Sequence, residues 1–286
     1  MADTSEKLTR VRGYIDRMPS LPPTVTKVLE ICNDPKTSPV DLNRIISLDP
    51  VLMARVLRLI NSAYYGIPTK IVSMVRAIIM LGINTVKNLA LSTAVMDTLH
   101  RKSDLGVLDP VEFWRHSLAV GVTSKLLAKL AGVDASNLDE YFTAGLLHDI
   151  GKIPLDRVFA DEYARVIAVC AERKSPLATV ERELLGFDHT DTGRIIVEAW
   201  RLGSVIRDTV SHHHDPAGYG GPDRNIVYTV HAASHYVNQK SIGDAGDRFP
   251  AGLDPIVAKT LQIDNQIMDG ITATVDAEIQ KAEIFL

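Results

Sequence analysis

The sequence lacks an excess of positive charge. Its 31 lysines and arginines are outnumbered by 35 aspartates and glutamates, which leaves a net charge of −4 and an isoelectric point of about 6.1. Clustered basic residues are the electrostatic signature of proteins that bind nucleic acids or anionic membrane surfaces. We therefore expect no direct binding to DNA and no association with a membrane.

Long apolar runs are also missing. Arg76, Lys87 and Asp97 interrupt the longest candidate, so no stretch reaches the roughly 20 apolar residues that cross a bilayer as a helix. Residues 1–12 are polar and charged and do not have the pattern of a secretory signal. These two absences predict a cytoplasmic protein.

Cysteine is scarce, with Cys32 and Cys170 as the two examples. Both lie on apolar stripes with helical spacing, where a thiol behaves as a small hydrophobic side chain. We interpret them as reduced core thiols, which argues against a disulfide framework and against a cysteine metal site.

Hydrophobic residues are plentiful, at 46% against 23% charged, so a sizeable core can form. Their spacing is helical, and the alternation typical of strands is hard to find. Helix boundaries are well marked in the first hundred residues. Ser38 with Asp41 is typical of a capping box, Asp49 before a proline repeats the start signal, and Ser73 and Gly82 delimit another helix.

A polar connector at residues 101–110 separates this helical stack from a second helical set. The expected fold is all-α and two-lobed, with an N-terminal helical lobe at 1–100 packed on a second helical lobe at 108–286. We expect both lobes to form one folding unit, because the connector is short and both sets of apolar stripes need covering. A helix at 84–98 is expected to complete the first lobe. The second lobe is expected to form helices at 111–131, 138–150, 161–173, 176–185, 190–201, 203–214, 224–238 and 256–282, with loops at 215–223 and 241–255.

Histidines and carboxylates of the second lobe fall on inward-facing positions of successive helices. Buried polar side chains need partners, and neutral imidazoles with carboxylates inside a helical bundle suit a divalent transition metal such as iron, manganese or zinc. A lone helical histidine is more often a packed, hydrogen-bonded residue, but the convergence favours a metal or former metal site. The candidate metal ligands are Glu112, His116, His148, Asp149, His189, His213 and His214.

Several segments have simpler interpretations. Glu112 and His116, four residues apart on one helical face, could form a surface pair. Residues 212–214 could be a polar helix end whose charge suits the helix dipole. The glycines at 218–222 have no following Lys-Ser or Lys-Thr, so we expect a turn rather than a phosphate-binding loop. Residues 61–66 could be a binding surface, although such a segment is more often a helix end with a glycine stop.

Short motifs follow one another across about residues 15–240. They are Leu21-Pro22-Pro23, Asp49-Pro50, LRLINSAYYG at 57–66, AIIMLG at 77–82, Trp114-Arg115-His116-Ser117, GLLHDIGK at 145–152, Leu185 to His189, Trp200, and His213 to Pro216. Their order and spacing resemble those of the HDOD family. The resemblance implies an all-α fold with an HD-like helical core. It also implies an output or regulatory role in bacterial signalling, often judged non-catalytic, with signalling proteins as partners.

The related HD-GYP phosphodiesterases hydrolyse cyclic dinucleotides at a bi- or trinuclear metal centre. Through this resemblance, their ligands correspond to the seven candidates named above, and their phosphate-binding lysine corresponds to Lys152. If the site is active, Asp149 and Lys152 are the expected catalytic residues. The correspondence fails at Ser234, which stands where the HD signature has its closing aspartate; His231, one turn earlier, could substitute for it.

The GYP motif is absent as such. The loop at 218–222 has the right glycine–proline spacing only if the histidine pair is counted as His212-His213. The apolar stripe that runs through residues 202–210 instead continues into His213 and His214, and we follow the stripe.

Two functions from different classes therefore compete. The first is a regulatory module that acts by protein interaction, with an HD-type site that is vestigial or holds metal. The second is a metal-dependent phosphohydrolase of the cyclic-dinucleotide phosphodiesterase type. Because a missing carboxylate at Ser234 weakens a bridged metal site, the regulatory module is favoured. The sequence leaves the upstream signal and the oligomeric state open.

Overall fold

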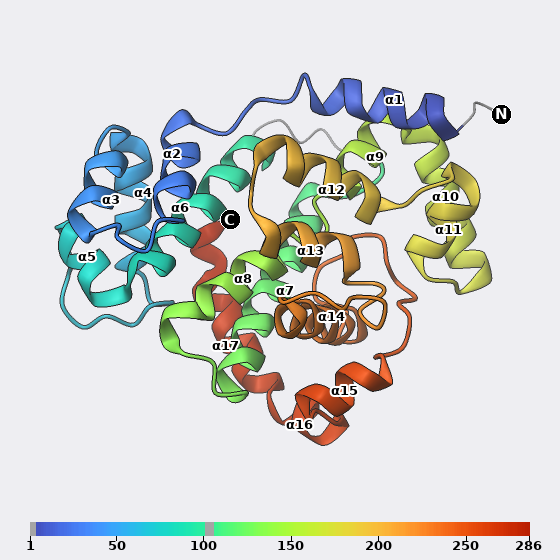
Figure 1. Cartoon of the computed structure of the whole chain (residues 1–286). Coiled ribbons are helices and arrows are strands. Elements are labelled where there is room, and N and C mark those ends of the chain that lie inside the picture. Colours follow the sequence, from blue (N-terminus) through green and yellow to red (C-terminus); the bar gives the residue numbers. More distant parts are fainter. Residues whose placement is uncertain (1–3, 101–105) are drawn as a thin grey trace.

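The computed structural model describes residues 4–100 and 106–286, and the regular elements within these residues are all helices, with no strand (Figure 1). This confirms the expected all-α fold. Residues 101–105 of the expected connector lie outside the described residues. The helices of the first lobe are α2 (Pro23–Ile31), α3 (Pro39–Ile46), α4 (Pro50–Ile60), α5 (Met74–Leu81) and α6 (Ile83–His100).

The starts of three of these helices, α3, α4 and α5, are set by side-chain caps that the sequence predicts. Ser38 and Asp41 form a capping box, in which the Ser38 hydroxyl accepts from the Asp41 N–H at 3.2 Å and the carboxylate accepts from the Ser38 N–H at 3.1 Å. Asp49 caps α4 by accepting from the Leu52 N–H at 2.9 Å, and Ser73 caps α5. Since one such cap contributes about 1 kcal/mol, local sequence decides where these helices begin.

The second lobe is built around the close packing of α7 on α8. A Cβ atom on Gly145 would lie 2.8 Å from Ser124 Oγ and 2.9 Å from Gly121 Cα, so only glycine lets the two helices approach this closely. Around this pair lie α7 (Pro110–Leu130), α8 (Leu138–Leu147), α9 (Lys152–Val158), α10 (Ala160–Arg173), α11 (Leu177–Leu185), α12 (His189–Trp200), α13 (Ser204–His212) and α14 (Arg224–Gln239), with a 3₁₀ turn at Ala135–Asn137.

Two helices were not expected from the sequence. The first is α1 (Thr4–Ile15), which packs against α9 and α12 of the second lobe rather than against its sequence neighbours (Figure 1). The second is α9. The helix expected at 138–150 ends at Leu147, the chain turns at 148–151, and α9 follows. Residues 152–156 are all buried, the charged Lys152 and Asp156 included, so α9 does not show the division into apolar and exposed polar faces by which a surface helix is recognised in a sequence.

The prediction of one continuous helix at 256–282 is wrong, because the structure divides this segment into three helices. The first break falls at Gln262, whose φ of +54° is left-handed and ends a helix. The next helix is capped by Asp264, which accepts from the Ile267 N–H at 2.8 Å. The segments are α15 (Pro255–Leu261), α16 (Asn265–Gly270) and α17 (Thr272–Ala282), followed by a 3₁₀ turn at Glu283–Phe285.

The lobes meet where α6 packs on α8 and around residues 61–66. The Tyr65 hydroxyl donates to Asp139 Oδ1 at 2.9 Å, and the Tyr64 ring packs on Phe142 with centroids 5.7 Å apart. This segment is therefore a helix end that forms part of the contact between the lobes. That both lobes fold as one unit remains a prediction.

Within the described residues, no single helix has the length and the apolar composition needed to cross a bilayer. The pair α5 and α6 meets the requirement only when taken together, and its two halves are bent by 116°. The break falls at Gly82, whose φ is +89°.

Candidate metal centre

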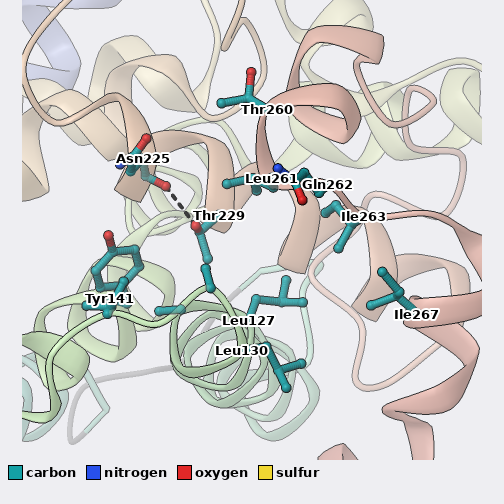
Figure 2. Close-up of a pocket in the computed structure, with 13 residues that line it drawn as sticks. Leu127, Leu130, Tyr141, Asn225, Thr229, Thr260, Leu261, Gln262, Ile263 and Ile267 are labelled. Atoms are coloured by element: carbon teal, nitrogen blue, oxygen red, sulfur yellow. Dashed lines mark hydrogen bonds between the residues drawn. The ribbon is translucent and has the colours of Figure 1, made fainter.

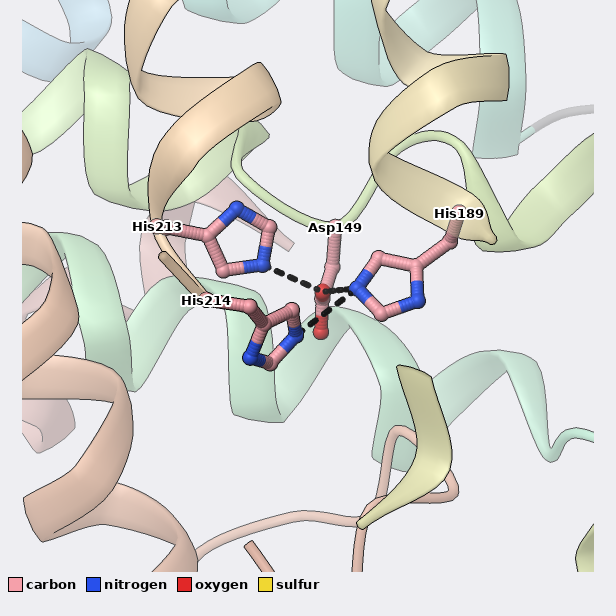
Figure 3. A group of neighbouring side chains, drawn as sticks. All are labelled: Asp149, His189, His213 and His214. Atoms are coloured by element: carbon pink, nitrogen blue, oxygen red, sulfur yellow. Dashed lines mark hydrogen bonds and ion pairs between the residues drawn. The ribbon is translucent and has the colours of Figure 1, made fainter. Parts of the chain in front are cut away.

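The predicted histidine and aspartate ligands converge at the centre of the second lobe from four parts of the fold, and Figure 3 shows four of them, Asp149, His189, His213 and His214. Each of them is at most 1% exposed except His214, which is half-buried. His116 lies on α7, His148 and Asp149 follow the end of α8, His189 is the first residue of α12, and His213 and His214 follow α13.

Two glycines bring the turn after α8 against the start of α12. A Cβ atom on Gly151 would lie 1.9 Å from the His189 carbonyl oxygen and 2.4 Å from the Gly193 nitrogen, so no other residue fits there. The Thr192 hydroxyl donates to the Gly151 carbonyl at 2.7 Å and holds the contact. This close approach places Asp149 beside His189.

The carboxylate of Asp149 lies between two groups of imidazoles. Its Oδ1 is 3.4 Å from His189 Nε2 and 3.6 Å from His213 Nε2 (Figure 3). Its Oδ2 is 3.3 Å from His148 Nε2 and 3.7 Å from His116 Nε2.

The cluster thus contains two sets of ligand atoms that share one aspartate. Within each set, the ligand atoms all lie within 4.8 Å of one another, which is close enough to surround one metal ion. The Oδ1 group comprises Asp149, His189, His213 and His214, and the Oδ2 group comprises His116, His148 and Asp149. In the Oδ1 group, His214 Nε2 also lies 2.9 Å from His189 Nε2.

The outer ring nitrogens fix which nitrogen faces the cluster. His148 Nδ1 lies 2.7 Å from the Gly145 carbonyl, His213 Nδ1 lies 3.1 Å from a carbonyl of the last turn of α13, and His189 Nδ1 lies 2.6 Å from Glu181 Oε2. Each of these oxygens can only accept, so Nδ1 carries the proton in each ring. In the neutral rings, Nε2 is left with a lone pair that points at the cluster, as a metal ligand requires.

Several of these inward-facing atoms lack a hydrogen-bond partner among the described residues. They are Nε2 of His116, His148 and His213, together with Asp149 Oδ1. A buried polar atom without a partner costs about 1–3 kcal/mol, and four around one point are rarer still. One divalent cation in each ligand group would satisfy these atoms, and the mixture of imidazole and carboxylate donors suits iron, manganese or zinc.

The charge states also fit a metal site. Burial lowers the pKa of His116 to about 4 and holds the pKa values of His148 and His214 well below their usual range, so these rings are neutral. Burial raises the pKa of Asp149, but the positive charge that His148 and Lys152 can carry outweighs it and holds that pKa well below its usual range. Neutral imidazoles around an ionised carboxylate are the forms that bind a metal.

The two remaining predicted site residues, Lys152 and Glu112, differ in whether they reach the cluster. Lys152 is 1% exposed and its ammonium donates to Asp149 Oδ2 at 2.6 Å, so it is part of the cluster. The Glu112 side chain is 40% exposed, lies 3.9 Å from Arg115, and belongs to neither ligand group.

Ser234, His231 and His212 are the three positions at which the sequence departs from the HD-type motifs or leaves alternatives open. Ser234 is buried and brings a hydroxyl, not a carboxylate, to its position. His231 Nδ1 lies 2.7 Å from the His213 carbonyl and its Nε2 accepts from the Asp254 N–H at 3.1 Å, so both ring nitrogens are engaged outside the cluster. His212 lies outside both groups and stacks on a tyrosine, with ring centroids 5.0 Å apart.

Sequence analysis missed Glu181, a fully buried carboxylate on α11. It accepts from His189 Nδ1 at 2.6 Å, from the His189 backbone N–H at 3.0 Å and from the Tyr163 hydroxyl at 2.8 Å. A signal for it existed, because Glu181 stands four residues after Leu177 and four before Leu185 on a buried stripe.

A second missed carboxylate, Asp247, lies in the loop before α15 and is 4% exposed. Its Oδ1 accepts from the Leu177 N–H at 3.2 Å, its Oδ2 has no partner among the described residues, and burial raises its pKa. The same loop packs tightly on α7, since a Cβ atom on Gly243 would lie 2.4 Å from the His116 nitrogen. The loop therefore covers the cluster on its α7 side.

The fold and this cluster define the class as an all-helical module with a buried histidine–aspartate centre. The sequence model of the HDOD domain matches residues 18–216, and the chain belongs to the HDOD domain family. An uncharacterized protein of Treponema pallidum (strain Nichols) is 24% identical over 212 residues, which make up 74% of this chain. The match covers 40% of that protein, so the chain spans less than half of the relative's length.

Solved structures share the fold over nearly the whole chain. An HDOD domain protein of unknown function from Geobacter sulfurreducens is 26% identical, with a TM-score of 0.78 over 99% of this chain and 100% of that one. A candidate signal transduction protein from Marinobacter aquaeolei VT8 is 19% identical, with a TM-score of 0.74 over 99% and 66%. A candidate metal-dependent phosphohydrolase from Shewanella amazonensis SB2B is 20% identical, with a TM-score of 0.63 over 98% and 100%.

Proposed function

We propose that this HDOD chain is a cytoplasmic regulatory module of bacterial signalling that acts by binding other proteins, and that its HD-type site holds iron, manganese or zinc. The observation that carries the metal assignment is the set of four buried, inward-facing atoms without hydrogen-bond partners among the described residues. The residues that would hold the ion are the Oδ1 and Oδ2 groups, with Glu112 outside them.

The burial of this site, which leaves little access for water or a substrate, supports the regulatory role. Catalytic metal sites keep an open position for water or substrate, whereas structural sites are enclosed by protein ligands. In this cluster only His214 is more than 1% exposed, and Lys152 is held against Asp149 rather than extended toward a substrate. The hydroxyl of Ser234 also leaves the site with one carboxylate fewer than the HD signature.

The second candidate is a metal-dependent phosphohydrolase of the cyclic-dinucleotide phosphodiesterase type. One observation favours it: the two ligand groups share Asp149, the arrangement in which one carboxylate bridges two ions. Solved structures with this fold carry names of both kinds, signal transduction protein and phosphohydrolase, so these names support both candidates equally.

Turnover distinguishes the two functions. Purified chain loaded in turn with iron, manganese and zinc is incubated with a cyclic dinucleotide, and the linear product is measured. We expect no product above a metal-only blank. Steady hydrolysis that His148→Ala abolishes and that the neighbouring control His212→Ala leaves intact would establish the enzyme and end the regulatory-only account.

A further inference from the structure

The histidines of the cluster differ in what holds their outer nitrogen. His148 and His213 are held by backbone carbonyls, which are neutral. His189 differs from them: its Nδ1 donates a hydrogen bond to a carboxylate, that of Glu181, at 2.6 Å. Among the described residues, no other cluster histidine has a carboxylate at its outer nitrogen. The two ligand groups are therefore unequal, because only the Oδ1 group contains a histidine with an anionic partner.

Glu181 is itself firmly placed. Its Oε2 accepts from both the backbone N–H and the ring of His189, which fixes the ring relative to the start of α12. Its Oε1 accepts from the Tyr163 hydroxyl of α10 at 2.8 Å, and all three residues are fully buried. Turning the His189 ring away from the cluster would break a charge-assisted hydrogen bond inside the protein.

A carboxylate behind an imidazole makes the imidazole a better metal ligand. It fixes the tautomer and orientation, and its negative charge increases the basicity of the opposite nitrogen. His148 of the Oδ2 group has a neutral backbone carbonyl, that of Gly145, in this position instead.

The Oδ2 group has a second disadvantage. The Lys152 ammonium donates to Asp149 Oδ2 at 2.6 Å, so it competes for the ligand atom of that group and repels a cation placed there. Asp149 Oδ1 has no such competitor and no hydrogen-bond partner among the described residues.

We infer that Glu181 makes the Oδ1 group the tighter of two metal subsites, so that the first ion binds there and the Oδ2 group fills only at higher metal concentration. Glu181 is thus a positioning residue that acts through His189, with Tyr163 holding it in place. This inference rests on the metal site of the proposed function.

The test is a titration of the metal-free full chain with Zn²⁺ against a chromophoric chelator. The wild type should show a tight and a weak binding class. Glu181→Gln keeps an acceptor for His189 but loses the charge, and should weaken the tight class about 10-fold; Glu181→Ala loses both and should weaken it by up to about 100-fold. The matched control, His116→Ala, should remove the weak class and leave the tight class unchanged.

Two further measurements separate positioning from a general effect on folding. In the metal-free wild type, ¹⁵N NMR should show His189 protonated at Nδ1, and Glu181→Ala should lose this preference. Tyr163→Phe keeps Glu181 and its charge, so it should weaken the tight class less than Glu181→Gln does, with a melting temperature close to that of the wild type.

The outcomes are distinguishable. A wild type that binds no Zn²⁺ would contradict the proposed metal site itself. If the wild type binds tightly and both Glu181 variants bind equally tightly, the role of Glu181 is wrong while the site stands. Loss of the tight class in His116→Ala would show that the order of filling is the reverse.

Discussion

Acid should destabilise the metal-free protein through its buried histidines. The folded pKa of His116 is about 4, against an ordinary value of 6.5, because the ring is buried. Between these two pH values the unfolded chain binds a proton at this residue and the folded chain does not. The free energy of unfolding therefore falls as the pH drops from 6.5 to about 4, and the contribution of His116 no longer changes below about pH 4. At about 1.4 kcal/mol per pKa unit, the loss from His116 is roughly 3 kcal/mol.

Other cluster residues modify this loss. Burial also lowers the pKa values of His148 and His214, so they too remove stability as the pH falls below 6.5. His189 acts oppositely and at higher pH, because its folded pKa is raised: it adds stability as the pH falls toward 6.5, and its contribution is constant below that pH. The net effect is a loss, and a few kcal/mol is a large share of the roughly 5–15 kcal/mol by which most domains are stable.

The assay is urea unfolding in EDTA at half-unit steps from pH 7.5 to 4.5, followed by tryptophan fluorescence. His116→Gln should reduce the pH-dependent loss by about 3 kcal/mol. The control Ser92→Ala removes a buried hydrogen bond to Thr143 of 3.1 Å and should lower stability by about 1 kcal/mol at every pH without changing the slope. A wild-type stability that is constant or rises between pH 6.5 and 4.5 would refute the reasoning.

Three further predictions concern the rest of the chain. The lobes should unfold together, so circular dichroism, which reports both, and the fluorescence of Trp114 and Trp200, which lie in the second lobe, should give one urea midpoint; two separated midpoints would contradict this. Burial raises the pKa values of Cys32 and Cys170 to about 11, so at pH 8 their alkylation should be about 100-fold slower than that of a thiol with a pKa of 9; equal rates would show that the thiols are not buried. The chain should not bind random duplex DNA, and salt-dependent micromolar binding would overturn that expectation.

Local sequence signals predicted much of the fold because they act within a few residues. Ser38 and Asp49 cap helices in the structure as their sequence contexts indicate. The helices that sequence analysis missed depend on distant partners: α1 packs against α9 and α12, which follow it by more than a hundred residues. In α9 even the charged Lys152 and Asp156 are buried, so its sequence does not have the amphipathic period of a surface helix.

The candidate site shows the same division. His213 and His214 continue an apolar stripe, so their inward position could be predicted, and the structure brings them to the cluster. Glu181 and Glu183 lie two residues apart on α11, yet Glu183 is exposed and pairs with an arginine while Glu181 is fully buried. Only the approach of α12, a tertiary contact, gives Glu181 its partner His189.

The metal content of the protein tests the central claim most directly. Wild type, His148→Ala and His212→Ala are purified in parallel without a metal-affinity column, and iron, manganese and zinc are measured by elemental analysis. The account predicts at least one ion per chain in the wild type and in His212→Ala, and loss of most of it in His148→Ala. A metal-free wild type that takes up none of the three metals when they are added would contradict it.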